Sequence, residues 1–492
     1  MKKRPQKSAK LPLNSNLDDL NGKAKALLHP AAPAGSKVRG LPDARRQIAR
    51  KYGFPTWKKL KDAVESLNVQ SALGQARKAV QFDDTAEFRR VVEKCPALRA
   101  SIDEPVFDFN SPLIIHAKSR AMLEELLEAG ADINGRSRWE PGSFGLLDTA
   151  PKDVASYAIE RGAIITAHAA ARLGLLDKLE ELVTADPRLV HARGGDGQTP
   201  LHFASTVEIA EYLLNCGADI NALDMDHSST PAQWMIRSRP EIARFLIQRG
   251  CKTDILMAAA LGDSGVVESH LRNDPESIRM RVSDEYFPLI DSGHNGGTIY
   301  QWELGWYVSA IQVAKSFGHP RVFQMLMDRC PPDEKLLNAC WLHDDGLVRS
   351  LLEQHPDLGK RLSPAGQRNL AHAARNNDAA AVRLMILAGL PLDSVSQHRA
   401  TTLHWAAWHG NIELVRLILD GHPPLEARDR DYNGTPLGWA IHASLHGWHP
   451  DQGDYPGTVE ALLNAGAKVP DGTGGSEAVQ KVLSRYLIAL AS

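Results

Sequence analysis

The 492-residue sequence predicts an all-α protein, a solenoid of about twelve stacked helix pairs with one β-hairpin-like finger inserted among them. Three observations predict this class. A glycine-containing phrase recurs at the ends of expected helices, a threonine-containing phrase recurs at their starts, and both return at intervals near 33 residues. The length also favours a repeat array, because a single hydrophobic core rarely grows beyond about 250–300 residues.

The recurring helix end is an apolar pair, a few polar residues, a glycine and an extended tail, as in LLEAGADIN at 126–134 and LLNCGADIN at 213–221. A glycine here is typical of a helix C-cap, because it adopts the left-handed backbone conformation without a steric cost. The glycines at this place are Gly130, Gly162, Gly217, Gly250, Gly389, Gly421 and Gly466. A longer variant ends in proline instead, as in LEELVTADPRLV at 179–190.

The recurring helix start reads TPLHFA at 199–204, TTLHWAA at 401–407 and TPLGWA at 435–440. Threonine as the N-cap, followed by proline in the first turn, is a strong helix-start signal. The T-P-L-H-x-A motif, with its 33-residue period, resembles the ankyrin repeat. That resemblance implies a turn and two antiparallel helices per unit, and it implies that His202 and His404 hold the backbone between neighbouring repeats.

The resemblance extends to a set of long bacterial ankyrin-repeat proteins with an N-terminal helical cap. It rests on GTPLGWAIH followed by HGWHPDQGDY, and on the segment RRQIARKYGFPTWKKLK before the array. We expect a basic, largely disordered tail at 1–40, the helical cap at 41–70, N-terminal repeats at 71–283 and the finger at 284–308. C-terminal repeats follow at 309–470, with an insertion near 445–456, and a capping helix at 471–492 closes the array.

The segment 41–66 has two interpretations. As a cap, it would cover the first repeat with Ile48, Phe54, Trp57 and Leu60. Alternatively, it would be a helix-turn-helix that contacts DNA through its many Lys and Arg residues. We favour the cap, because the chain as a whole carries 57 Lys and Arg against 59 Asp and Glu and is not basic.

Composition narrows the class of protein further. The five cysteines are scattered and form no C-x-x-C pair, so neither a disulfide framework nor a zinc site is indicated. The basic start lacks the apolar run of a secretory signal, and no apolar stretch of about 18 residues predicts a membrane span. We therefore expect a cytoplasmic monomer that binds no membrane, nucleic acid, metal or cofactor.

Candidate binding residues come from aligning the repeat units. In the ankyrin family the first helix lines a concave groove, and the position after the motif histidine and the position three further on face inward. In this sequence both columns become rich in Trp and His in the C-terminal repeats, which flank the finger and the insertion. The candidates are His294, Trp302, Glu303, Trp341, His372, Arg375, Trp405, Trp408, His409, Trp439, His442 and Asp454.

Three functions fit this cluster. Its rings could simply pack against the finger and the insertion, they could form a hot spot for a protein or peptide, or they could line a small-molecule pocket that stacks a carbohydrate-like ring. No catalytic motif assigns any residue a catalytic role. A triad of His442, His446 and His449 could suggest a metal, but Gly447 and Pro450 are expected to end the helix there. The prediction is a binding scaffold for a protein or peptide, with a small-molecule binder or enzyme as the alternative.

Overall fold

The computed structural model describes residues 17–28, 38, 40–140, 142–290, 293, 296–470, 472 and 474–491. Across these residues the chain is helical, and strand pairing is limited to four isolated bridges. None of the described helices is both long enough and apolar enough to cross a membrane. The chain divides into two compact units, with the boundary between Pro231 and Ala232.

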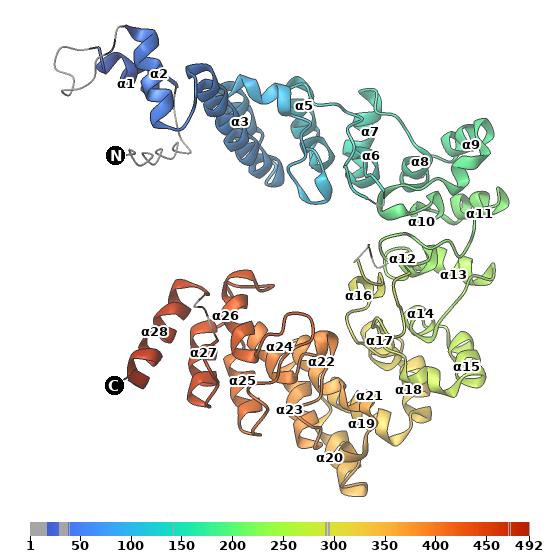
Figure 1. Cartoon of the computed structure of the whole chain (residues 1–492). Coiled ribbons are helices and arrows are strands. Elements are labelled where there is room, and N and C mark those ends of the chain that lie inside the picture. Colours follow the sequence, from blue (N-terminus) through green and yellow to red (C-terminus); the bar gives the residue numbers. More distant parts are fainter. Residues whose placement is uncertain are drawn as a thin grey trace. The chain divides into compact units, whose positions relative to one another are not determined.

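The first unit begins with three helices, α1 (Leu17–Ala26), α2 (Leu41–Lys51) and α3 (Trp57–Gln81). Its later helices are α4 (Thr85–Lys94), the 3-10 helix η3 (Leu113–His116), α5 (Arg120–Glu128), α6 (Leu146–Thr149), α7 (Lys152–Glu160), α8 (Ala167–Leu173), α9 (Leu176–Ala185), α10 (Pro200–Phe203) and α11 (Val207–Asn215). Figure 1 shows these elements in blue to green along the chain.

The second unit continues the same pattern (Figure 1). Its helices are α12 (Pro231–Met235), α13 (Pro240–Gln248), α14 (Ile255–Leu261), α15 (Ser264–Asn273), α16 (Tyr300–Glu303), α17 (Ala310–Ser316), α18 (Pro320–Arg329), α19 (Pro332–Trp341), α20 (Asp345–Gln354), α21 (Pro364–Gln367), α22 (Asn369–Arg375), α23 (Ala379–Leu387), α24 (Thr402–Trp408), α25 (Ile412–Leu419), α26 (Pro436–His446), α27 (Tyr455–Asn464) and α28 (Glu477–Ala491).

Within the described residues, twelve successive helix pairs follow one another, if the C-terminal half of α3 is counted with α4 and η3 with α5. First helices pack on first helices of the next pair, as α22, α24 and α26 do, and second helices pack outside them. Apolar side chains from these layers form one continuous core in the C-terminal repeats, from Trp306 to Leu483. The predicted all-α solenoid is confirmed.

The glycine caps follow the sequence prediction at six of the seven positions. Six of the seven glycines have positive φ, from 84° at Gly389 to 101° at Gly466. Gly421 does not, and the left-handed residue there is His422, with φ 54°. A Cβ atom at Gly421 would lie 2.4 Å from Leu392 Cδ1, so this glycine makes room for the Leu392 side chain and does not adopt the left-handed cap conformation.

The segment 284–308 differs from the predicted β-hairpin-like finger. Its described residues contain the short helix α16 and no strand, and an isolated bridge joins Arg281 to Ser309 beside its two ends. The aromatic side chains do not alternate across a ribbon, because Tyr300 is buried and donates a hydrogen bond from its hydroxyl to Asp254 Oδ2 at 2.8 Å. Residues 291, 292, 294 and 295, and with them the candidate His294, lie outside the described residues.

Part of the segment 1–40, predicted to be a largely disordered tail, is helical. Residues 17–26 form α1, whose Leu20 and Ala24 are buried against α2. The rest of the predicted tail lies outside the described residues, apart from a few positions. Sequence patterning underestimated α1 because most of its residues are polar and only one narrow face is apolar.

Both ends of the array carry helices outside the repeats. α1, α2 and the first half of α3 share a small core that includes Ile48, Leu60 and Val64, and the predicted boundary at residue 70 falls inside the continuous helix α3. At the other end, α28 packs on α27 and buries Val479 and Leu483 in the core of the C-terminal repeats.

Candidate functional site

The C-terminal repeats place a pocket between α24, α26, the two loops that precede these helices and the segment that follows α26. α24 is fixed to the second loop by His404. Thr401 N–H donates to His404 Nδ1 at 3.1 Å, so the Nε2–H is free to donate to Gly434 O, also at 3.1 Å. Burial lowers the pKa of His404, which keeps the ring neutral and suited to both bonds. The motif histidine therefore has a structural role: its hydrogen bonds join the start of its own helix to the loop of the next repeat.

Two indole rings form the buried floor of this pocket. Trp405 is 2% exposed and Trp439 is 7% exposed, and their ring planes are perpendicular with centroids 5.1 Å apart. Trp405 Nε1–H donates to Ser396 Oγ at 2.8 Å, and Trp439 Nε1–H donates to Asp429 Oδ2 at 2.9 Å. Both rings are held by packing and by a hydrogen bond, so their orientation is fixed before any ligand arrives.

Asp429 organises the loop that carries one wall of the pocket. Its Oδ1 accepts from the amides of Asp431 and Tyr432, and its Oδ2 accepts from the amide of Gly434 as well as from Trp439. Burial acts to raise the pKa of Asp429, but these hydrogen bonds outweigh it and leave the pKa below its ordinary value. The buried group is thus a carboxylate at neutral pH.

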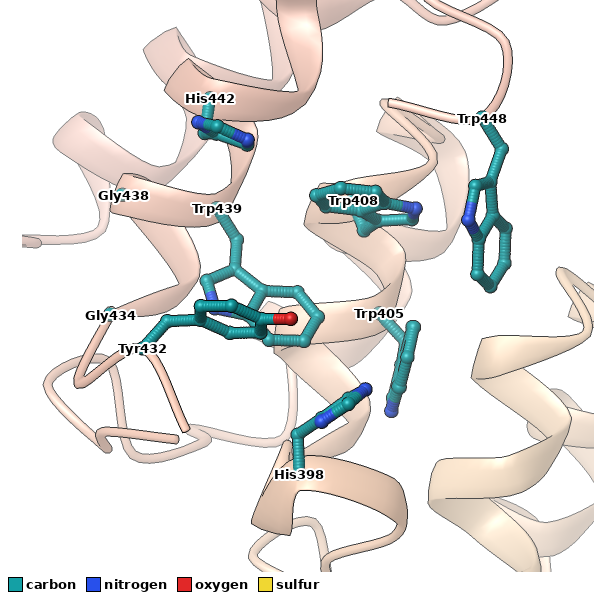
Figure 2. A pocket seen from close by; sticks show the side chains of 9 residues that line it. All are labelled: His398, Trp405, Trp408, Tyr432, Gly434, Gly438, Trp439, His442 and Trp448. Carbon is teal, nitrogen blue, oxygen red and sulfur yellow. The ribbon is translucent and has the colours of Figure 1, made fainter. Parts of the chain in front are cut away.

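The pocket has a volume of about 430 Å³ (Figure 2). Its lining residues are His398, Trp405, Trp408, Tyr432, Gly434, Gly438, Trp439, His442 and Trp448. Tyr432 and Trp448 are exposed, at 72% and 49%, and in Figure 2 they stand on opposite sides of Trp439 and Trp408. The arrangement is an aromatic box with a rigid floor and accessible walls.

A second aromatic cluster lies on the other side of Trp405. The guanidinium carbon of Arg375 is 4.2 Å from the ring centroid of Trp306, 5.5 Å from that of Trp405 and 5.4 Å from that of Trp448. Burial lowers the pKa of Arg375 to about 10, so this side chain is still charged at neutral pH. Cation–π contacts to three rings stabilise the charge there.

His372 is the buried centre of that cluster. Its ring stacks on Tyr307 with centroids 3.5 Å apart, and its Nδ1 accepts from Trp306 Nε1–H at 3.3 Å. Burial, together with the nearby charge of Arg375, lowers the pKa of His372 well below its ordinary value. A neutral histidine enclosed in this way holds α22 to the segment that precedes α17, and it does not face the pocket.

Four of the twelve predicted site residues line the pocket together: Trp405, Trp408, Trp439 and His442. Two more, Arg375 and His409, lie beside it. His409 shares a hydrogen bond of 2.8 Å with Arg375 O, and its ring meets Trp448 edge to face. Asp454 serves as a helix cap, accepting from the amide of Gly457, and His372 belongs to the buried cluster.

The remaining predicted residues lie away from the pocket. Trp341 is buried and donates from Nε1 to Asn369 Oδ1 at 2.9 Å. Trp302 is 71% exposed and its Nε1–H points to Gly296 O, while Glu303 faces Arg237 at 3.8 Å. Trp302 and Glu303 lie on α16 and Asp454 caps α27, and none of these three predicted residues lines the pocket.

Sequence reasoning missed five of the nine lining residues. Two are glycines, Gly434 and Gly438, and the other three, His398, Tyr432 and Trp448, lie outside the α-helices. His398 has φ 62° and its Nδ1 shares a hydrogen bond of 2.6 Å with Asp431 Oδ2. The sequence does contain a signal for the loop that carries Tyr432. Asp429 and Gly434, which are joined by a hydrogen bond in this loop, stand directly before the T-P-L start of α26. In the described residues, no group of three His, Cys, Asp or Glu side chains is placed to hold a metal ion.

Comparison with known proteins points to one family. A family model described as ankyrin repeats (3 copies) matches residues 167–257, 336–429 and 370–471. Two relatives come from Arabidopsis thaliana. An E3 ubiquitin-protein ligase, KEG, is 23% identical over 268 residues, or 51% of this chain and 16% of that protein. A serine/threonine-protein kinase, VIK, is 26% identical over 195 residues, or 39% of this chain and 41% of that protein. The chain thus spans less than half the length of either relative.

Proposed function

Since this chain is an ankyrin-repeat protein, we propose that it is a binding scaffold that recognises a protein or peptide partner through the aromatic pocket of its C-terminal repeats. Ankyrin repeats are generally protein-interaction modules, and the stack supplies a rigid frame on which a site can be built. The expected cytoplasmic location and monomeric state belong to this proposal.

The observation that carries the proposal is the exposure of large aromatic side chains over a preformed floor. Trp448 and Tyr432 leave much of their ring surface in water, although the ring of Trp448 stacks on Trp405 with centroids 5.8 Å apart. Aromatic residues concentrate binding energy at interfaces, because a rigid ring buries a large area at a small entropic cost. A partner side chain that fills the box would bury both walls.

A small-molecule function is the weaker alternative. The volume falls in the range of about 300–1,000 Å³ typical of ligand pockets. However, a carbohydrate needs many hydrogen-bonding groups, and the indole N–H groups of Trp405 and Trp439 are already used by Ser396 and Asp429. The lining consists mainly of aromatic ring faces and contains no Lys, Arg, Asp or Glu that could bind several sugar hydroxyl groups, which suits an apolar or cationic side chain better than a sugar.

The test is selection of a displayed random-peptide library on the full-length protein, followed by affinity measurements. Trp448→Ala should weaken binding of the selected peptides by about 30-fold or more, the effect of losing a hot-spot contact. Trp302→Ala is the matched control, because it removes an exposed tryptophan outside the pocket. Selected peptides that bind wild type and Trp448→Ala equally well, or a failure to select any peptide, would contradict the proposal.

A further inference from the structure

Trp439 occupies a special electrostatic position in the pocket. Its ring meets Trp405, Trp408 and His404 edge to face, with centroids 5.1–5.6 Å apart. Its N–H donates to the ionised carboxylate of Asp429. A hydrogen bond from an indole N–H to an anion pushes electron density into the ring, which makes the ring face more negative. The buried charge of Asp429 therefore acts on the pocket through Trp439.

The pocket lining contains no Lys, Arg, Asp or Glu among its nine residues. A primary ammonium group would lose its hydration here and find no carboxylate in the lining to replace it. A methylated ammonium group needs no such hydrogen bonds, because its charge is spread over methyl groups that contact ring faces directly. The chemistry of the walls thus separates a methylated from an unmethylated cation.

We propose that this pocket binds a quaternary methylammonium group, presented by the partner as a methylated lysine side chain. The inference rests on the proposed function and specifies its ligand. Figure 2 shows how indole, phenol and imidazole rings surround the space at different angles, as a cage for a compact cation requires. The pocket volume exceeds that of a trimethylammonium head, so room remains for the methylene chain.

Arg375 supports the cationic preference of this cluster. The ring surfaces of Trp405 and Trp448 already attract its guanidinium from outside the pocket. Across the described residues, no Lys or Arg is found over the rings of Trp408 or Trp439. Both rings line the pocket, so the surface that each exposes there can contact a ligand cation. Trp408 Nε1 has no hydrogen-bond acceptor in the described part of the chain.

The decisive comparison uses two probes of equal shape. Choline and its neutral isostere 3,3-dimethylbutan-1-ol differ essentially in the charge at the branched centre. Both are titrated into the full-length protein and followed by intrinsic tryptophan fluorescence. Choline should bind at least about tenfold more tightly, by the usual strength of a desolvated cation–π contact. Equal affinity for the two probes would overturn the inference and leave a merely apolar pocket.

Two variants test whether the preference for a cation comes from the pocket rings. Trp408→Phe removes no hydrogen bond and leaves a poorer cation–π ring, so it should weaken choline binding several-fold and change binding of the neutral isostere little. Trp302→Ala should change neither. If Trp408→Phe weakens both probes equally, the ring contributes area alone and the cation preference is refuted.

A second pair of probes distinguishes the source of the cation and the fate of the proposed function. Short peptides carrying trimethyllysine or unmodified lysine are compared at the same site. Tighter binding of the trimethyllysine peptide supports a protein partner. Binding of choline without any gain for that peptide would overturn the methyllysine assignment. Library peptides that bind through Trp448 while choline does not bind would leave the proposed function standing and refute only this inference.

Discussion

The repeat that begins at Thr199 in the first unit and the repeat that begins at Thr401 in the second unit share one scaffold. In both, the Thr amide donates to the motif histidine Nδ1 at 3.1 Å, and histidine Nε2 bonds a carbonyl of the next loop, Ser229 O or Gly434 O. The residue after the histidine differs. Phe203 is half-buried against His168, whereas Trp405 is buried under a wall of further aromatic rings.

The difference shows which positions of a repeat can change to form a binding pocket while the scaffold stays the same. α10 ends at Phe203, directly after the motif, while α24 continues to Trp408 and brings a second inward ring into the same site. The histidine hydrogen bonds that join adjacent repeats are the same in both units. The pocket comes from three changes at other positions: a larger ring after the histidine, one more helical turn, and a loop that presents Tyr432.

The largest expected effect is a difference in stability between the variants that remove Trp405 and Phe203. Trp405→Ala should lower the free energy of unfolding by about 3–5 kcal/mol, because it removes a fully buried indole. Phe203→Ala should cost about half as much, since its ring is partly solvent-exposed. Guanidinium unfolding, combined with hydrogen exchange over each repeat, measures both. Trp448→Ala is the control for an exposed ring and should cost under about 1 kcal/mol. Equal losses for Trp405→Ala and Phe203→Ala would break the distinction.

Removing the motif histidine should destabilise the two units equally. His202→Ala and His404→Ala should each cost about 1–3 kcal/mol, because each leaves the buried Thr amide without its acceptor and removes the histidine's bond to the loop carbonyl, which still accepts from the amide of Asp224 or Asp429. Glutamine at either position should restore part of the loss. In α17, Gln312 Oε1 accepts from the Ser309 amide at 3.0 Å and so performs half of the histidine's role. A large loss of stability in only one of the two variants would show that the motif histidine does not have the same structural role in both repeats.

Sequence reasoning predicted the helix starts, most of the helix ends and four lining residues, since these depend on local signals. A threonine cap and a glycine after the helix act within one turn, and a fixed repeat period then brings Trp405, Trp408, Trp439 and His442 onto neighbouring helices. Such positions can be aligned without knowing the structure.

The loops and the segment 284–308 could not be predicted in the same way. Tyr432 takes its place because Asp429 collects four hydrogen bonds, and His398 because its backbone is left-handed. In 284–308, glycines and aromatic residues match the composition of a hairpin, but burial of Tyr300 and Tyr307 in the second unit decides the conformation. Tertiary burial outweighs local propensity there.

Acidity should weaken the repeats around α22. Burial lowers the pKa of His372 well below its ordinary value of about 6.5, so the folded chain stays unprotonated where the unfolded chain takes up a proton. The stabilisation is fully present above about pH 6.5 and is lost as the pH falls below it. Hydrogen exchange of α22, corrected for intrinsic rates, should show less protection at pH 5 than at pH 7.

The control for this pH effect is His372→Asn, which retains a polar side chain without the titration. Burial raises the pKa of Asp284, which acts in the opposite direction, but Asp284 is present in both proteins and cancels in the comparison. The pH dependence should therefore be smaller in the variant. An unchanged dependence would mean that His372 is not the group that titrates.

The smallest expected effect reverses its sign between repeats. The motif position of His404 is occupied by Gly438 in α26, where a Cβ atom would meet only Thr435 Oγ1, at 3.6 Å. Gly438 does not have positive φ, so alanine fits its backbone. Gly438→Ala should therefore raise the free energy of unfolding by about 0.5–1 kcal/mol through the higher helix propensity of alanine. Thermal unfolding beside His404→Ala tests the contrast: alanine stabilises one repeat and destabilises the other at the same motif position. A loss of stability in Gly438→Ala would show that the absence of a side chain at this position is required by the packing of α26.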